Sequence, residues 1–142
     1  RWKQHLNINV KLLKQDWKGY QDSEKNLNYW VSRAGWIGDF VDPITFLDMF
    51  TSGNGNNRTG YRSPAYDILV QMCGSETDPA VRTSLMQQLE RMLLDDAVIA
   101  PLYFYTVKYL KAEEVKNLPP NILRYRRWDM VYIDDGSGAT AN

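Results

Sequence analysis

A length of 142 residues suits one ordinary domain, and 44% hydrophobic with 24% charged residues is typical of a soluble globular protein. Lysine plus arginine equals aspartate plus glutamate at 17 each, so the net charge gives no attraction for nucleic acid or an anionic membrane surface. No apolar run approaches the roughly 20 residues that span a bilayer, and a single cysteine excludes an internal disulfide.

The first 36 residues are predicted to alternate between helix and strand. Residues 1–6 have the composition of a helix end. Residues 8–12 alternate in polarity, which predicts a half-buried strand, and Asp16 begins a short helix. Residues 27–36 mix aromatic and β-branched side chains, which predicts a second strand.

A helix is predicted after this strand. Asp42 suits its N-cap and Pro43 its first position, and an apolar stripe follows at Ile44, Leu47 and Phe50. Residues 52–60 are dense in glycine and asparagine and predict a loop. We expect Asn56 and Asn57 to be solvated there.

Two longer helices follow, beginning at Ser63-Pro64 and Asp78-Pro79. The second is predicted to end near Asp95. Apolar residues recur at helical spacing in both. The predicted buried faces are Ala65, Ile68, Leu69, Met72 and Cys73 in the first helix, and Val81, Leu85, Leu89, Met92 and Leu93 in the second.

The last third is predicted to be mainly extended. Residues 98–105 form a continuous apolar run, which indicates a strand covered on both faces, with Tyr103 and Tyr105 in sheet packing and ligand contact as their alternative role. The segments after it read as a strand at 107–112, a proline-containing connection at 113–121, an aromatic extended stretch at 122–133 and a flexible Gly/Ser/Ala tail at 136–142. Alternating strands and helices predict an α/β or mixed α+β class.

Asp39 is the first candidate functional residue. It lies between the strand ending at Trp36 and the helix beginning at Pro43, too early to cap that helix. We expect Trp36 and Phe40 to exclude water around it, and a carboxylate in such a setting binds a cation or raises its pKa. This favours a site for an amine, with a solvated loop aspartate as the alternative.

The stretch GWIGDFVDP at positions 35–43 resembles the solute-binding proteins of ABC importers for oligopeptides, dipeptides and related solutes (extracellular solute-binding protein family 5). Their mark is an aromatic residue, a short gap, an aspartate, and then an acidic residue with proline. The resemblance continues in NVKL at 9–12 with QDW at 15–17, in NN at 56–57 through YRSPAYD at 61–67, and in APLYFY at 100–105.

The resemblance implies a two-lobed protein several times larger than this chain. Residues 1–106 would form part of its second lobe, and residues 107–142 would cross back toward the first lobe, ending in the tail at 136–142. The chain would be a C-terminal fragment of a protein on the periplasmic or extracellular face of the cytoplasmic membrane.

The resemblance also implies roles for single residues. Asp39 would anchor the α-amino group of a peptide, and the main chain around Trp36 and Ile37 would hydrogen-bond the ligand as an added strand does. Arg33 would reach the ligand's carboxylate, unless it forms a structural ion pair with Asp16 or Asp42. Trp36 has a packing role as its alternative. The predicted ligand-binding set is Arg33, Ala34, Gly35, Trp36, Ile37 and Asp39.

Signs of catalysis are weak. His5 has no second histidine or cysteine near it in the sequence, so a metal site or activated nucleophile lacks parts. Asp39 and Asp42 suggest a two-carboxylate hydrolase, although Asp42 is needed as a cap. No glycine-rich phosphate cradle precedes a helix.

The predicted function is therefore capture of oligopeptides and their delivery to an ABC permease, with no cofactor, no nucleic acid and no reaction on the ligand. Arg33 favours oligopeptides over dipeptides. A binding protein for another solute (a dipeptide, a nickel chelate or a sugar), a carboxylate-dependent hydrolase and a purely structural interaction domain remain open.

Overall fold

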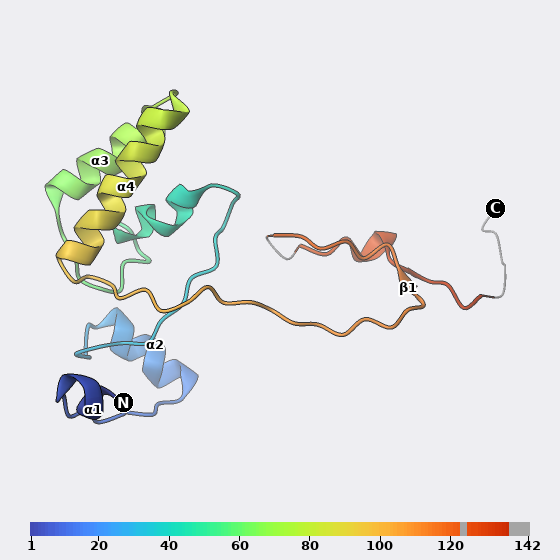
Figure 1. The fold of residues 1–142 in the computed structure, drawn as a ribbon, viewed down its shortest axis with the longest axis horizontal. Coiled ribbons are helices and arrows are strands. Elements are labelled where there is room, and N and C mark those ends of the chain that lie inside the picture. The colour runs from blue at the N-terminus through green and yellow to red at the C-terminus, as the bar shows by residue number, and fades with distance from the viewer. Residues whose placement is uncertain (123–124, 137–142) are drawn as a thin grey trace.

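A computed structural model describes residues 1–122 and 125–136 of the chain. It consists of a helical body at residues 42–99, a smaller helical unit before it and an extended arm at residues 100–136 (Figure 1). The helices are α1 (Trp2–Leu6), α2 (Trp17–Lys25), η1 (Pro43–Phe46), η2 (Asp48–Phe50), α3 (Pro64–Ser75), α4 (Pro79–Asp95) and η3 (Trp128–Met130), where η denotes a 3-10 helix. The strands are β1 (Val115–Lys116) and β2 (Tyr132–Ile133).

The predicted helix starts are confirmed by their caps. The side chain of Asp16 accepts the main-chain N–H of Gly19 at 2.7 Å, and Asp78 accepts that of Ala80 at 2.8 Å. Ser63 caps α3 in the same way. Asp42 caps η1, but two short 3-10 helices, η1 and η2, replace the single helix predicted there. Each cap satisfies main-chain donors within three residues, which explains why the sequence reveals these positions.

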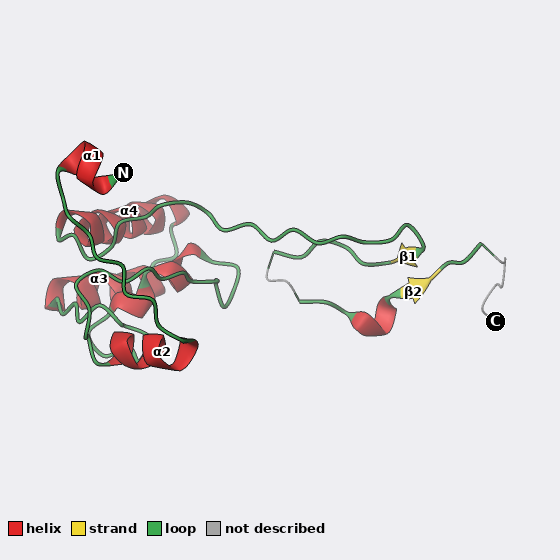
Figure 2. Cartoon of the chain, turned by 90° about the horizontal axis from the view of Figure 1, so that it is seen from below, coloured by secondary structure: helices red, strands yellow, loops and turns green. Residues whose placement is uncertain are grey.

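The core of the body lies where α3 packs on α4, with η2 beneath them. Figure 2 shows α3 and α4 from a second direction. The fully buried Tyr66 ring is tied to η1 and η2 because its hydroxyl donates to the carbonyl of Leu47 at 2.9 Å. The buried core residues are Phe50, Tyr66, Cys73, Leu85, Leu89 and Leu93.

The predicted inner face of α4 is largely confirmed, since Leu85, Leu89 and Leu93 are buried, although Val81 is exposed. The predicted face of α3 is wrong in part. Ile68 and Met72 are about half exposed, at 56% and 49%. The helix instead buries the set Tyr66, Leu69, Val70 and Cys73, with Leu69 and Val70 partly buried. Tyr66 rotates the inner face because its large ring fills the core.

The predicted strands at 8–12, 27–36, 98–105 and 107–112 are wrong in this structure. These segments belong to no strand, and within the described residues the sheet is the antiparallel pair β1 and β2, with Val115 opposite Ile133. The predicted burial of 98–105 holds in part for Val98 and Ile99, which pack against the core, and fails beyond them, because Phe104 is 99% exposed. Extended chain becomes sheet only when another strand supplies hydrogen bonds, and none lies beside these segments in the described part of the chain. The class is nevertheless mixed, with helices and a small sheet.

The arm leaves the body after Ile99 and carries the hairpin closed by β1 and β2 away from it (Figures 1 and 2). Several large apolar side chains along it are exposed, among them Leu102, Phe104, Leu110, Ile122 and Trp128. Of the flexible tail predicted at 136–142, residues 137–142 lie outside the described residues, as do 123–124 within the predicted extended stretch. In the part of the chain that the structure describes, no helix combines the length and apolarity needed to cross a membrane.

The loop between η2 and α3 is organised by Asn57, whose predicted solvation is wrong. Its side-chain amide donates to the carbonyls of Phe50, Thr51 and Tyr61 at 2.9 to 3.1 Å. Its side-chain oxygen accepts from the main chain and the hydroxyl of Thr59. One amide thus replaces several main-chain hydrogen bonds that an irregular loop cannot make. Asn56, by contrast, is exposed.

Candidate functional site

The candidate binding segment, residues 33–41, connects the α2 unit to η1 as an extended and largely exposed chain. Residues 33–37 are all exposed, with Trp36 at 36% and Ile37 at 57%. No hydrogen bond between described residues uses the main chain of residues 34–38. A Cβ placed on Gly35 would meet nothing within 4 Å. The segment therefore offers unpaired main-chain groups of the kind that pair with an extended peptide.

Asp39 stands at one end of this open main chain. Its N–H donates to the hydroxyl of Thr45 at 3.0 Å, while its carboxylate accepts no hydrogen bond from the described residues. The predicted absence of a capping role is confirmed, because Asp42 caps η1. The carboxylate is thus held by its main chain and left open to an outside partner.

The predicted exclusion of water around Asp39 is wrong. Asp39 is exposed, and Trp36 and Phe40 are 36% and 45% exposed. Neighbours in an extended chain do not close over each other without a second surface against them. The half-buried Asp48 lies near enough for the charge of Asp39 to help raise the pKa of Asp48, although burial is the larger cause. This edge is therefore negatively charged, which suits a cation.

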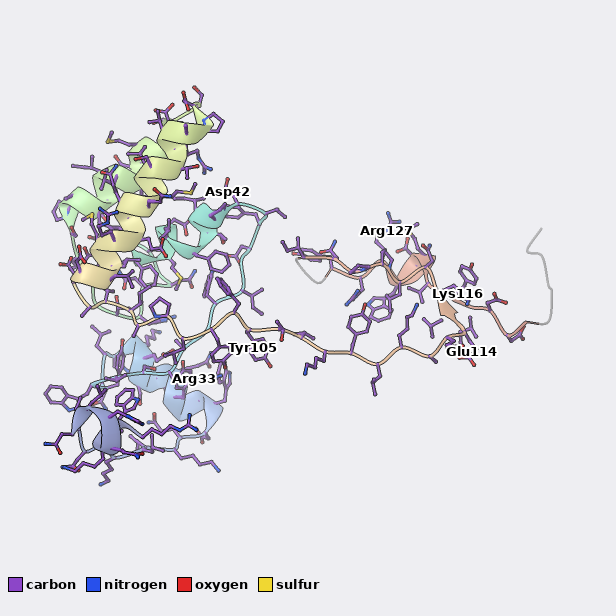
Figure 3. The ribbon with its side chains drawn as sticks, viewed as in Figure 1. Arg33, Asp42, Tyr105, Glu114, Lys116 and Arg127 are labelled. Carbon is purple, nitrogen blue, oxygen red and sulfur yellow. The ribbon has the colours of Figure 1, made fainter. Side chains whose placement is uncertain are left out.

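Arg33 stands at the opposite end of the segment, beside two tyrosines of the arm (Figure 3). Its guanidinium donates to the hydroxyl of Tyr103 at 3.2 Å, a contact that raises the pKa of Arg33. Its carbonyl accepts from the hydroxyl of Tyr20 at 3.1 Å. Tyr103 and Tyr105 are exposed at this place, so their predicted role in sheet packing is wrong.

The alternative of a structural ion pair for Arg33 is not found. Asp16 caps α2, Asp42 binds Arg82, and Arg33 forms no ion pair with any described residue. Its positive charge therefore remains available to an anion.

Arg82 is a structural residue that sequence reasoning missed. Its guanidinium donates two hydrogen bonds to the carboxylate of Asp42, at 2.9 and 3.0 Å, and its Nε donates to the carbonyl of Cys73 at 3.1 Å. The paired guanidinium holds the pKa of Asp42 below its usual range. No local signal in the sequence reveals the pair, because 40 residues separate its members. Asp42 is thus occupied by a cap and an ion pair.

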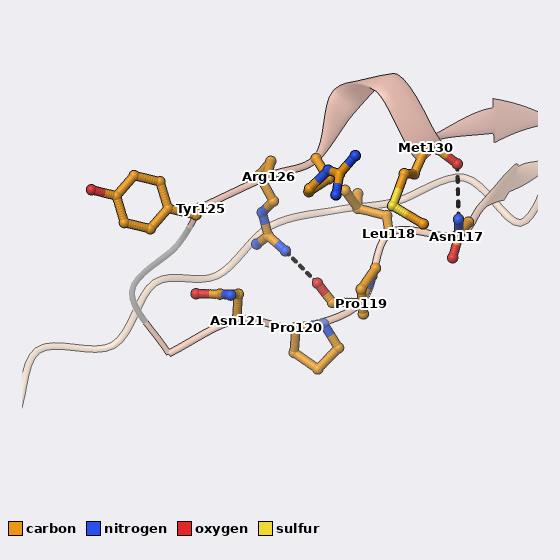
Figure 4. Close-up of a pocket in the computed structure, with 9 residues that line it drawn as sticks. Asn117, Leu118, Pro119, Pro120, Asn121, Tyr125, Arg126 and Met130 are labelled. Atoms are coloured by element: carbon orange, nitrogen blue, oxygen red, sulfur yellow. Dashed lines mark hydrogen bonds between the residues drawn. The ribbon is translucent and has the colours of Figure 1, made fainter. Parts of the chain in front are cut away.

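A small cavity of about 120 Å³ lies in the distal part of the arm (Figure 4). Arg126 crosses it to donate to the carbonyl of Pro119 at 2.9 Å, and Asn117 donates to the carbonyl of Met130 at 3.0 Å. A volume of this size holds a few waters and no peptide. Within the described residues, no group of three or more His, Cys, Asp or Glu is placed to hold a metal ion.

Comparison with known proteins identifies the family, although no protein-family model matches the chain. The chain is 37% identical to the oligopeptide-binding protein OppA of Bacillus subtilis over 118 residues, and 38% identical to the dipeptide-binding protein DppE of the same organism over 116 residues. Each match covers 82% of this chain. The chain belongs to the oligopeptide- and dipeptide-type solute-binding proteins. It spans about a fifth of the length of these relatives, 22% and 21%.

Solved structures of this solute-binding family agree with the assignment. The murein tripeptide-binding protein MppA of Escherichia coli superposes with a TM-score of 0.82 at 36% identity, over 93% of this chain and 26% of that protein. OppA of Haemophilus influenzae, in complex with the peptide RPPGFSPFR, superposes with a TM-score of 0.81 at 33% identity, over 94% of this chain and 26% of that protein. The chain, with its helices and small sheet, is a part of this two-lobed fold.

Proposed function

We propose that the whole protein captures oligopeptides outside the cytoplasmic membrane and delivers them to an ABC permease without altering them. The chain described above supplies one wall of the binding site. The observation that carries the proposal is the open carboxylate of Asp39 at one end of an unpaired main chain, with the unpaired charge of Arg33 at the other. The OppA relative solved with a bound peptide supports it.

The two charged ends suit the two ends of a peptide. The amino terminus of the peptide would bind Asp39, and its carboxylate would turn toward Arg33. The peptide's main chain would pair with the main-chain groups of residues 34–38, which include the predicted Ala34, Gly35, Trp36 and Ile37. Arg33 and Asp39 are six residues apart, and extended chain of that length covers at most about 20 Å. A peptide that binds Asp39 with its amino terminus and Arg33 with its carboxylate would therefore have at most roughly six residues. Main-chain pairing accepts many side chains, since every peptide offers the same donors and acceptors.

The proposal extends to the two parts of the chain. Residues 1–106 would belong to the lobe that carries Asp39, and residues 107–142 would cross to the other lobe. In support, the contact of Tyr103 with Arg33 lies near the point where the arm departs, and Leu110 beyond it is fully exposed. An exposed apolar series of this kind is normally covered by a partner surface, here the remainder of the same protein.

Dipeptide binding is the second candidate. It is favoured by the 38% identity to the dipeptide-binding protein DppE, which is as high as the 38% to OppA of Escherichia coli and the 37% to OppA of Bacillus subtilis. A carboxylate-dependent hydrolase is not proposed, because Asp42, its second carboxylate, is bound to Arg82.

Calorimetry on the whole protein tests the proposal. A pool of tripeptides to pentapeptides with free amino termini should bind at least tenfold more tightly than the same pool after N-acetylation. Mass spectrometry of the molecules that co-purify with the protein should find short peptides, and their length separates oligopeptide from dipeptide binding. Equal affinity for free and acetylated pools would remove the role of Asp39.

A further inference from the structure

Thr45 is a buried polar residue whose hydroxyl serves the candidate site. It is 2% exposed in η1, and its Oγ1 accepts the main-chain N–H of Asp39 at 3.0 Å. Among the described residues, this is the hydrogen bond that holds Asp39, because its carboxylate accepts none. The position of the Asp39 main chain, from which the carboxylate projects, therefore depends on Thr45.

A second contact between the same two segments restrains the preceding residue. A Cβ placed on Gly38 would lie 3.0 Å from Cγ2 of Thr45 and 3.2 Å from Cζ of Phe46. The main chain at Gly38 thus approaches η1 so closely that a side chain at this position would push Thr45 or Phe46 aside by a few tenths of an ångström. Thr45 restrains two successive residues, one through its methyl group and one through its hydroxyl.

The helix that carries Thr45 is itself fixed to the body. Asp42, labelled in Figure 3, accepts the N–H of Ile44 at 2.9 Å and two hydrogen bonds from Arg82 of α4. Arg82 also binds the carbonyl of Cys73 near the end of α3. The position of Thr45 is therefore set by the packed helices α3 and α4, through Arg82 and Asp42.

We propose that Thr45 is a positioning residue that aims the carboxylate of Asp39 at the ligand's amino terminus, with the Arg82–Asp42 ion pair anchoring η1 beneath it. This inference rests on the proposed function. A preset carboxylate loses less conformational freedom on binding than one on a mobile loop, so the tether raises affinity for a free amino terminus.

The test uses the whole protein and the free and N-acetylated pools of tripeptides to pentapeptides. Thr45→Val keeps the shape but leaves the N–H of Asp39 without its acceptor, and Thr45→Ser keeps the hydroxyl. Thr51→Val is the matched control, because it removes a partly buried hydroxyl that binds the carbonyl of Asp48 and does not contact Asp39. We expect Thr45→Val to weaken binding of the free pool about fivefold, the effect of one lost hydrogen bond.

The acetylated pool should bind the Thr45→Val protein as it binds the wild type. Thr45→Ser and Thr51→Val should both keep the wild-type preference for free amino termini. In an Asp39→Asn background, Thr45→Val should have no further effect on the free pool, because the group that it positions is gone.

Equal losses for both pools, or full additivity with Asp39→Asn, would overturn the inference by showing that Thr45 acts through stability alone. A Thr45→Val protein with the wild-type preference would overturn it too. Failure of the proposed function looks different: the wild type and the Asp39→Asn protein would then bind the free pool equally well.

Discussion

The helical body and the extended segments obey different rules. In the body, Tyr66, Leu89 and Leu93 have no exposed surface, whereas in the arm Phe104 and Leu110 are completely exposed. Helices satisfy their own main-chain hydrogen bonds, so the body needs only the side-chain packing of α3 on α4 to form its core. Extended chain needs a partner, and the candidate site consists of such chain. The body thus supplies stability, and the segments that lack partners supply the candidate binding surface.

The largest expected effect is on the free energy of unfolding, and it tests the contrast between the body and the arm. Leu89→Ala in this chain should lower the free energy of unfolding by about 2–5 kcal/mol, because Leu89 is fully buried in the body. Leu110→Ala, its matched control in the arm, should change it by less than about 0.5 kcal/mol. Urea titration followed by circular dichroism measures both. In the whole protein Leu110→Ala should become destabilising, and a neutral result there would contradict the proposed cover of the arm.

The next effect is on binding. Asp39→Asn in the whole protein keeps the side-chain shape and removes the charge, so affinity for peptides with a free amino terminus should fall at least about tenfold, or 1.4 kcal/mol. Asp22→Asn, on the exposed part of α2, is the control that removes an equal charge away from the site. Calorimetry should show unchanged affinity for the control. A similar loss in both variants would indicate a general effect of charge.

A smaller effect is expected where the candidate binding segment meets the body. Gly38→Ala should lower the free energy of unfolding by about 1 kcal/mol, because its Cβ would press against the buried Thr45. Gly53→Ala provides the comparison, since a Cβ there meets nothing within 4 Å. Thermal unfolding of the two variants measures the difference. Equal stability would show that η1 yields to the segment, contrary to the restraint described above.

The smallest effect is the pH dependence of the Arg82–Asp42 pair, whose side chains are 24% and 32% exposed and so partly screened by water. The hydrogen bond from Arg82 lowers the pKa of Asp42 from its ordinary 3.8. The pair's contribution is therefore full above pH 3.8 and is lost as pH falls through the lowered pKa.

The measurement compares variants between pH 7 and pH 2. Arg82→Met should reduce the acid-dependent loss of stability, while Arg91→Met, on the exposed face of α4, should not. The half-buried Asp48 acts with the opposite sign, because its raised pKa favours folding as it takes up a proton. It is common to all variants and cancels in the comparison. Parallel pH profiles for wild type and Arg82→Met would refute the stabilising role of the pair.

The sequence alone revealed much of the body and the identity of the candidate site. Caps at Asp16, Ser63 and Asp78, the burial of Cys73 and the resemblance around Asp39 were all legible as local patterns. The roles assigned to Asp39, Arg33 and residues 34–37 in binding stay predictions. The strand predictions failed, because alternation and apolar runs describe a tendency to pair and say nothing of whether a partner is present.

What the sequence determined by itself is local: where helices begin, which stretches are extended and which loop carries the lone carboxylate. The reason is that caps and turns are satisfied within a few residues of the chain. Tertiary structure alone decided that Arg82 reaches Asp42 across 40 residues, that Tyr66 rotates the inner face of α3, and that Thr45 holds the main chain of Asp39. These contacts depend on how the helices pack, and packing joins residues that no local pattern connects.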